Sequence, residues 1–152
     1  MQKKAFTLVE LVIVAAILGI SIVGMMKLYI YTTVLSKLSE NKTLATGEVQ
    51  SKLELMRNHD FNNILADYSS GGTPGNTFQL TNLDGIGIIY INSANNDLYE
   101  VEIVACWRDK YGRIIGEDSD LDGILDMGED KNGDGKINSI AQIMGMIARR
   151  SG

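Results

Sequence analysis

The strongest constraint on this chain is an apolar run near its N-terminus. Phe6 to Met26 spans twenty-one residues, of which only Glu10 is ionisable. A helix of about 20 apolar residues is long enough to cross the hydrocarbon core of a bilayer. Lys3 and Lys4 precede the run, so the positive-inside rule predicts a cytoplasmic N-terminus and places the bulk of the chain outside. The rest of the 152 residues is enough for one small domain.

Glu10 is an unusual residue for such a position. A carboxylate inside a bilayer costs about 2.5 to 3.5 kcal/mol on insertion scales, so it usually marks a function or a partner. Cleavage between Ala5 and Phe6 would create an α-amino group one helical turn from Glu10, placed to meet the Glu10 of a neighbouring subunit. The alternative is that Glu10 lies at headgroup depth and has no role.

A short basic leader, a small residue and then FTLVELVIVAAILGI resemble the class III signal of type IV pilins and type II secretion pseudopilins. The resemblance implies that residues 1–5 are a leader and that a prepilin peptidase cuts between Ala5 and Phe6 and methylates the new amine. It also implies that Glu10 guides assembly. Two positions depart from the family pattern, because Ala5 stands where Gly is usual and Lys27 stands where many pilins have Pro.

The same resemblance implies where the chain acts and with what. The partners would be other pilin or pseudopilin subunits, the prepilin peptidase, an inner-membrane assembly platform and membrane lipid. The chain would lie in a bacterial inner membrane, with residues 6–30 as the membrane-spanning and filament-core segment and residues 31–152 as an extracytoplasmic head. It would then enter a pilus or pseudopilus filament.

The residue pattern predicts an α+β fold, and the predicted layout resembles that of pilin-like proteins. An apolar stripe continues the helix beyond the membrane, so one helix is expected over about 6–58, with its second half packed on a small antiparallel sheet. The stripe comprises Val34, Leu38, Ala45, Val49, Leu53 and Met56.

Four segments after the helix are candidates for the sheet. TFQLTNL and IGIIYI are short β-prone runs, NSANND reads as a turn, and LYEVEIVACWR alternates strictly over residues 98–108. The stretch INSIAQIMGMIARR, residues 137–150, fits either a helical face or a strand. We expect a strand beside residues 98–108, because Gly145 interrupts the helical pattern and the sheet needs a partner.

An acidic stretch over residues 118–138 resembles a calcium loop of the EF-hand type. In such loops oxygen ligands come from positions 1, 3, 5, 7, 9 and 12, and Gly at position 6 allows the turn. Counting from Asp118 fills every position, and Gly123 falls at position 6. The predicted ligands are Asp118, Asp120, Asp122, the carbonyl of Ile124, Asp126 and Glu129.

A second register starts twelve residues later but lacks its closing acid. Position 12 is Ala141, so this site either borrows Asp126 or Glu129 or binds weakly. The stretch also resembles the tandem calcium repeats of thrombospondins and dockerins, and we expect one or two calcium ions, two being favoured by the density of carboxylates. The predicted ligands of this register are Asp130, Asn132, Asp134, the carbonyl of Lys136 and Asn138.

A metal would serve this chain as a cross-link. Cys106 is its single cysteine, so no intramolecular disulfide can form, and a small secreted domain without disulfides often uses a metal instead. The eight acids and one lysine from Glu117 to Asp134 contribute −7 to a net charge of −5. The acidity is therefore local, and no basic stripe suggests nucleic acid.

The sequence shows no catalytic constellation. His59 is expected to cap or solvate a helix end, Trp107 to anchor the core, and Cys106 to be an unreactive thiol. We therefore expect a structural subunit, a minor pilin or pseudopilin with a calcium-stabilised head. The alternative is a membrane-anchored calcium-binding adhesion or interaction module that never polymerises.

Overall fold

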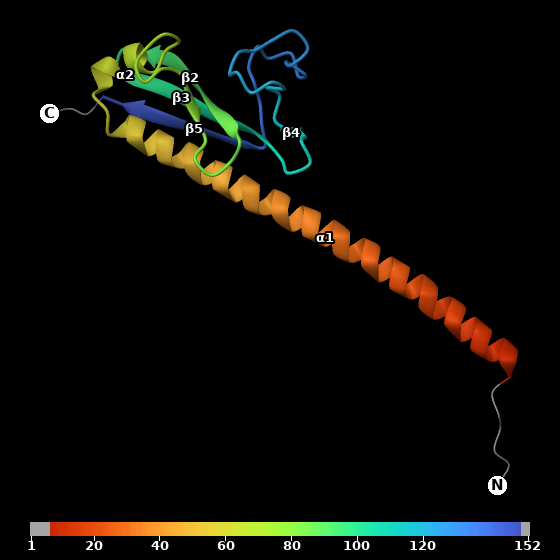
Figure 1. Cartoon of the computed structure of the whole chain (residues 1–152). Helices are drawn as coiled ribbons and strands as arrows, with labels where there is room; N and C mark the ends of the chain where they lie inside the picture. The colour runs from red at the N-terminus through yellow and green to blue at the C-terminus, as the bar shows by residue number, and fades with distance from the viewer. Residues whose placement is uncertain (1–6, 150–152) are drawn as a thin grey trace. The chain divides into compact units, whose positions relative to one another are not determined.

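The computed structural model describes residues 7–149, apart from the side chain of Ala94. It has the expected α+β arrangement of one long N-terminal helix and a small antiparallel sheet. The chain divides into two compact units, Met1–Ser39 and Glu40–Gly152. The elements, labelled in Figure 1 where there is room, are α1 (Leu8–Arg57), α2 (Phe61–Asp67), β1 (Thr77–Gln79), β2 (Gly85–Asn95), β3 (Leu98–Arg108), β4 (Ile114–Ile115) and β5 (Ala141–Ala148).

The first unit, as far as the structure describes it, is the N-terminal part of α1. Its large apolar side chains are all exposed between residues 8 and 31, from 50% at Val14 to 80% at Leu8. The helix is long and apolar enough to cross a membrane. Because so large an apolar surface is unfavourable in water, it requires lipid or other apolar helices as its surroundings.

The second unit, which we call the head, is built around β3. The sheet order is β1-β2-β3-β4, and β5 also pairs with β3, on the side that β4 occupies further along the strand. Every pairing is antiparallel. Figure 1 shows β2, β3 and β5 lying side by side.

Both faces of β3 are buried. On one face Val101, Ile103, Ala105 and Trp107 pack with the α1 residues Ala45, Val49, Leu53 and Met56 in the main core. The helical stripe and the alternation of the strand are thus confirmed, although Val34 and Leu38 are only half-buried. On the other face Val104 and Cys106 pack with Ile86, Ile88 and Ile137 in a second, smaller cluster.

The strand boundaries differ from the expected ones in two places. β2 runs on to Asn95 through the segment read as a turn, because Asn92 and Ser93 pair with Glu100 and Tyr99, so the turn shrinks to two residues. β1 ends at Gln79, before the end of the β-prone run. β5 is a strand beside β3, as expected. The short elements α2 and β4 were not expected.

Glu48 of α1 explains why β1 ends early. Its carboxylate accepts hydrogen bonds from the backbone N–H of Thr81 at 2.6 Å, the N–H of Asn82 at 2.9 Å and the Asn82 side-chain amide at 3.1 Å. The backbone after β1 therefore donates to the helix instead of continuing the sheet. Burial works to raise the pKa of Glu48, but the hydrogen bonds from Thr81 and Asn82 together lower it below its usual value.

We expect Glu48→Gln to destabilise the head by about 1 to 2 kcal/mol, since hydrogen bonds to a charged acceptor are lost. A lowered pKa stabilises the fold above the unfolded-state pKa, and that stabilisation disappears as the pH falls through the folded-state pKa. The difference between wild type and variant should therefore be constant near neutral pH and shrink below the ordinary value of 4.5. Denaturant unfolding of the full chain in detergent at several pH values measures it.

Glu54→Gln is the matched control. Glu54 lies on the same helix, is exposed, and pairs with Arg57 one turn away, so its replacement should cost less than about 0.5 kcal/mol. Equal losses for the two variants would contradict the role given to Glu48.

Candidate metal centre

The segment between β4 and β5 contains two loops of the same construction. The first loop is Asp118–Glu129, and the second loop is Asp130–Ala141, whose last residue is also the first residue of β5. In the first, one carboxylate oxygen of Asp118 accepts from the N–H of Leu121 at 2.7 Å and of Asp122 at 3.2 Å, and the other accepts from the N–H of Gly123 at 2.9 Å. The opening aspartate thus holds the backbone of its own loop in a tight coil.

The second loop repeats this construction with an offset of twelve residues. Asp130 accepts from the N–H of Gly133 at 2.6 Å, of Asp134 at 3.1 Å and of Gly135 at 2.9 Å. The left-handed positions also correspond, since φ is 64° at Leu121 and 78° at Gly133. The first six residues of the two registers therefore share one pattern of hydrogen bonds and left-handed positions.

The carboxylates of the first loop converge. Asp118, Asp120 and Glu129 can place one oxygen each within 4.8 Å of one another, and so can Asp120, Asp122 and Asp126. Asp120 belongs to both groups. These acids could bind a metal ion, because several hard oxygen atoms are brought to one centre.

Two of these acids are buried. Asp118 is 0% exposed and Glu129 is 5% exposed. Burial raises the pKa of Asp118, and the neighbouring Glu129 contributes in the same direction. The Ser119 side chain lowers the pKa of Glu129 by hydrogen bonding. Buried carboxylates at such spacing repel each other, and a cation between them would remove that cost.

Glu129 closes the first loop. One of its oxygens accepts from the backbone N–H and the hydroxyl of Ser119, both at 2.6 Å, and the other accepts from the N–H of Asp126 at 3.0 Å. The acid predicted at position 12 therefore joins the start of the loop to its end. The Ile124 carbonyl is predicted as a ligand only from its place in the register. The backbone N–H of Ile124 donates to a carboxylate oxygen of Asp122 at 2.7 Å.

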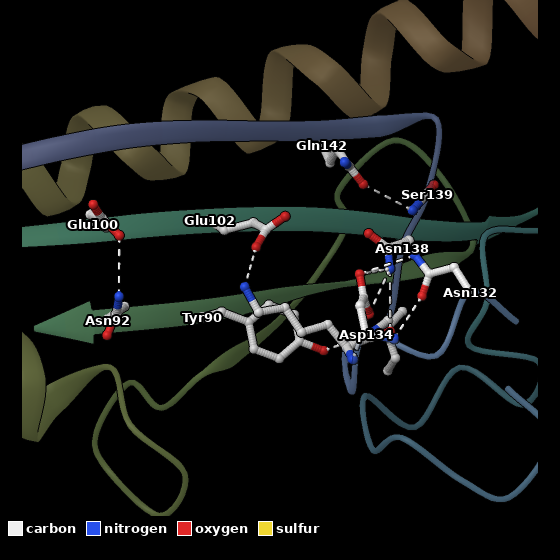
Figure 2. A network of polar contacts seen from close by, with 11 residues as sticks. Tyr90, Asn92, Glu100, Glu102, Asn132, Asp134, Asn138, Ser139 and Gln142 are labelled. Carbon is white, nitrogen blue, oxygen red and sulfur yellow. Dashed lines mark hydrogen bonds and ion pairs between the residues drawn. The ribbon is translucent and has the colours of Figure 1, made fainter. Parts of the chain in front are cut away.

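The second loop gathers fewer acids. Among the described residues, the three-acid groups do not include Asp130 or Asp134. The side-chain amides of Asn132 and Asn138 donate to Asp134 at 3.0 Å, and this cluster is drawn in Figure 2. The side chain of Lys136 leaves the loop and pairs with Glu102 of β3 at 2.6 Å. Only its carbonyl is thus available as the ligand predicted from the register.

Both loops are anchored on the face of the sheet opposite α1. Ile137 is fully buried, and its N–H donates to the hydroxyl of Tyr90 at 2.9 Å. Leu121 and Leu125 pack on the same small cluster. Glu117 accepts from the N–H of Lys131 at 3.3 Å and of Asn138 at 2.9 Å. The sequence predicted the ligands, but it gave no sign of these anchors.

Gly123 and Gly135 occupy equivalent positions with different surroundings. Their φ values are 79° and 76°, a conformation that costs a residue with a Cβ about 1 to 2 kcal/mol. A Cβ on Gly123 would also lie 2.7 Å from Cγ2 of Thr77, whereas nothing lies within 4 Å of one on Gly135. We expect Gly123→Ala to destabilise the head more than Gly135→Ala does, which thermal unfolding of the two variants can measure. Equal losses would show that the first loop does not pack on β1.

Glu10 forms a helix-capping interaction with Thr7 that the sequence analysis did not predict. The hydroxyl of Thr7 accepts from the N–H of Glu10 at 3.3 Å, and the Glu10 carboxylate accepts from the N–H of Thr7 at 3.5 Å. This reciprocal pair is a capping box, and the pattern Thr-x-x-Glu ahead of an apolar run was its available signal. Glu10 thus helps to begin α1 at Leu8. Ala5 and Phe6, the predicted processing residues, lie outside the described part of the chain.

The comparison with known families bears on this N-terminal segment. Residues 1–26 match the prokaryotic N-terminal methylation motif. The match supports a precursor of the type IV pilin or pseudopilin family, processed by a prepilin peptidase and assembled with other subunits. It points to a structural protein, and with the apolar helix it fits anchoring in the inner membrane before assembly. No curated protein and no solved structure matches the chain.

Trp107, Cys106 and His59, the other residues discussed in the sequence analysis, make contacts that stabilise the fold. Trp107 is fully buried in the core, and burial raises the pKa of the Cys106 thiol, which favours the unreactive form. The expectation for His59 was wrong, because its Nε2 lies 2.7 Å from a carboxylate oxygen of Asp67 in α2. Asp60 caps α2 by accepting from the N–H of Asn62 at 3.0 Å.

Proposed function

We propose that this chain is a structural subunit, a minor pilin or pseudopilin, of a type IV pilus or a type II secretion pseudopilus. The observation that carries the proposal is the methylation motif at residues 1–26. The helix that begins within it, at Leu8, has its apolar side chains exposed along its first 24 residues. A fixed membrane anchor needs the same apolar surface but has no use for a processing motif. Cleavage between Ala5 and Phe6 and polymerisation through α1 account for both features.

In the assembled state, Glu10 pairs with the α-amino group of Phe6 on a neighbouring subunit. The supporting argument is energetic, because a carboxylate among lipid-facing side chains is costly unless a cation neutralises it. Within residues 7–149 the capping box supplies only neutral groups, which do not compensate the charge of Glu10. Two roles therefore meet in one residue: local capping of α1, and pairing between subunits.

Three variants separate these two roles. Glu10→Gln keeps a side chain that can close the capping box but removes the charge, Thr7→Ala breaks the box but keeps the charge, and Glu10→Ala removes both. We expect Glu10→Gln and Glu10→Ala to abolish incorporation into filaments, whereas Thr7→Ala should assemble with a helix weakened by about 1 kcal/mol.

Sheared filaments and membrane fractions from the native host, analysed by intact mass, measure incorporation and processing together. The wild-type mature chain should begin at methylated Phe6. Normal assembly of Glu10→Gln would remove the pairing role, and a wild-type chain still carrying residues 1–5 would favour the non-polymerising anchored module.

Calcium is the second part of the proposal. We assign one ion to the first loop, with Asp118, Asp120, Asp122, Asp126, Glu129 and the carbonyl of Ile124 as its ligands. A second, weaker ion is assigned to Asp130, Asn132, Asp134, Asn138 and the carbonyl of Lys136. The metal would hold together the 25-residue connection between β4 and β5, which contains no helix or strand. It would act as a cross-link in a head that cannot form a disulfide.

We expect calcium at about ten times its dissociation constant to stabilise the head by roughly 1.4 kcal/mol, since only the folded state holds the site. Asp118→Asn should abolish most of this gain, while Asp130→Asn should remove only a weaker component. Thermal unfolding of the full chain with calcium and with chelator, together with a binding titration, measures both effects. A melting temperature that is the same with calcium and with chelator would contradict the assignment, as would magnesium producing the same gain.

A further inference from the structure

β5 is an unprotected edge of the sheet. In the described residues 7–149, its only strand partner is β3. The strand runs over eight residues, AQIMGMIA, with no charged residue and no proline, and its register with β3 has no bulge. Exposed edge strands usually carry a charge, a proline or a bulge, because an open row of N–H and C=O groups otherwise pairs with other chains. The opposite edge, β1, is only three residues long.

The hydrogen-bond pattern identifies the open groups. Arg149 N–H donates to the Asp97 carbonyl at 2.9 Å, just beyond the pair Leu98 and Ala148. Bonded and non-bonded pairs alternate along an antiparallel ladder, so Ile143, Gly145 and Ile147 bond to β3. The backbone groups directed away from β3 are therefore those of Gln142, Met144, Met146 and Ala148.

The side chains of β5 alternate between the two faces of the sheet. Ala141 and Ile147 are buried in the main core, and a Cβ on Gly145 would lie 2.7 Å from Leu53 of α1. Met144 and Met146 face the other side and are 72% and 63% exposed. They line a groove of about 380 Å³ together with Tyr90, Glu100, Glu102 and Lys136. Figure 2 looks onto this face, with β5 crossing in front of α1.

The sequence of the edge is palindromic. Residues 143–147 read Ile-Met-Gly-Met-Ile, with Gly145 at the centre. In an antiparallel pair of two identical strands centred on one residue, each residue lies opposite its mirror position. Met144 would face Met146 of the second chain, and Ile143 would face Ile147, so like meets like on both faces of the sheet. Arg149 would lie opposite Ala141, so no like charges oppose each other.

We propose that β5 pairs with β5 of a second copy of this chain, antiparallel and centred on Gly145. The backbone groups directed away from β3 at Gln142, Met144, Met146 and Ala148 are those that this register joins across the two-fold axis. The two sheets then form one continuous sheet, and the four methionines form a single apolar surface on the face opposite α1.

The contact is weak for a single pair. One strand edge buries less area than the 1,200 to 2,000 Å² typical of stable complexes. Repetition along two neighbouring filaments would strengthen it through effective concentration. A two-fold contact is not generated by the heterologous packing that builds one helical filament, so it would join two filaments side by side. This last consequence rests on the proposed function, whereas the pairing of two chains does not.

Cross-linking of full chains in detergent tests the pairing and its register. Met144→Cys is mixed with isotope-labelled Met146→Cys and oxidised. Residues in a hydrogen-bonded pair have Cα atoms about 5.5 Å apart, within the range for a disulfide. We expect the mixture to form labelled–unlabelled dimers several-fold faster than either variant alone forms dimers, because the Met144 positions of two chains lie beyond that range. Cys106 is buried and stays in place in all variants.

Met127→Cys, labelled and unlabelled, gives the rate of chance collisions, since Met127 is fully exposed in the first loop. A mixture rate equal to this background would overturn the pairing. Equal rates for the mixture and for each variant alone would overturn the register. A second mixture, Gln142→Cys with Ala148→Cys, should repeat the result of the first.

The proposed lateral contact between two filaments is tested separately, on assembled filaments. Met144→Lys filaments should remain single where Met127→Lys filaments associate laterally, as seen by electron microscopy. If no filaments form at all, the proposed function fails while the cross-linking result stands. If both variants associate equally, the pairing plays no part in lateral contact.

Discussion

The burial of β3 on both faces and along both edges is the constraint on which the head depends. The strand pairs with β2 on one side and with β5 and β4 on the other. Ile103 and Ala105 face α1, and Val104 and Cys106 face the opposite cluster, each with no exposed surface. Apolar burial of this kind is the main favourable term in folding. It fixes where α1 docks and which face remains for the acidic loops.

The acidic loops follow from this arrangement. Their apolar residues, above all Ile137, complete the small cluster on the face opposite α1. Their opening aspartates, Asp118 and Asp130, satisfy backbone N–H groups that have no helix or strand to bond with. The carboxylates brought together in the first loop repel one another, an electrostatic cost that a bound cation would relieve. The candidate metal site therefore depends on the same packing that folds the head.

Two glutamates of α1, Glu10 and Glu48, have different electrostatic surroundings. Glu10 lies on an exposed apolar helix surface, its described hydrogen bonds are to the neutral Thr7, and a cation from another subunit would stabilise its carboxylate there. Glu48 carries a carboxylate that is satisfied within its own head by Thr81 and Asn82. The first suits contact between subunits and the second suits stability of one subunit. The open edge of β5 adds a backbone surface that no charge protects.

The sequence by itself determined a large part of this protein. The apolar run and the Glu10 motif predicted a membrane-spanning segment and gave the family likeness, because both signals are local patterns of residues. The helical stripe and the alternation of residues 98–108 were sufficient for α1, β3 and the α+β class, since periodicity reports which face is buried. The twelve-residue spacing of acids and glycines was enough to propose both loops.

Tertiary structure alone decided the rest. The end of β1 depends on Glu48, which is remote in sequence, and the extension of β2 depends on pairing with β3 through residues that favour turns. For residues 141–148 the sequence alone left helix and strand open, and the expectation of a strand already rested on a tertiary contact with residues 98–108. His59 contacts Asp67 only because α2 folds back beside the end of α1. In each case a contact between two different elements outweighed the preference of one segment, and the pattern within a single segment does not encode such a contact.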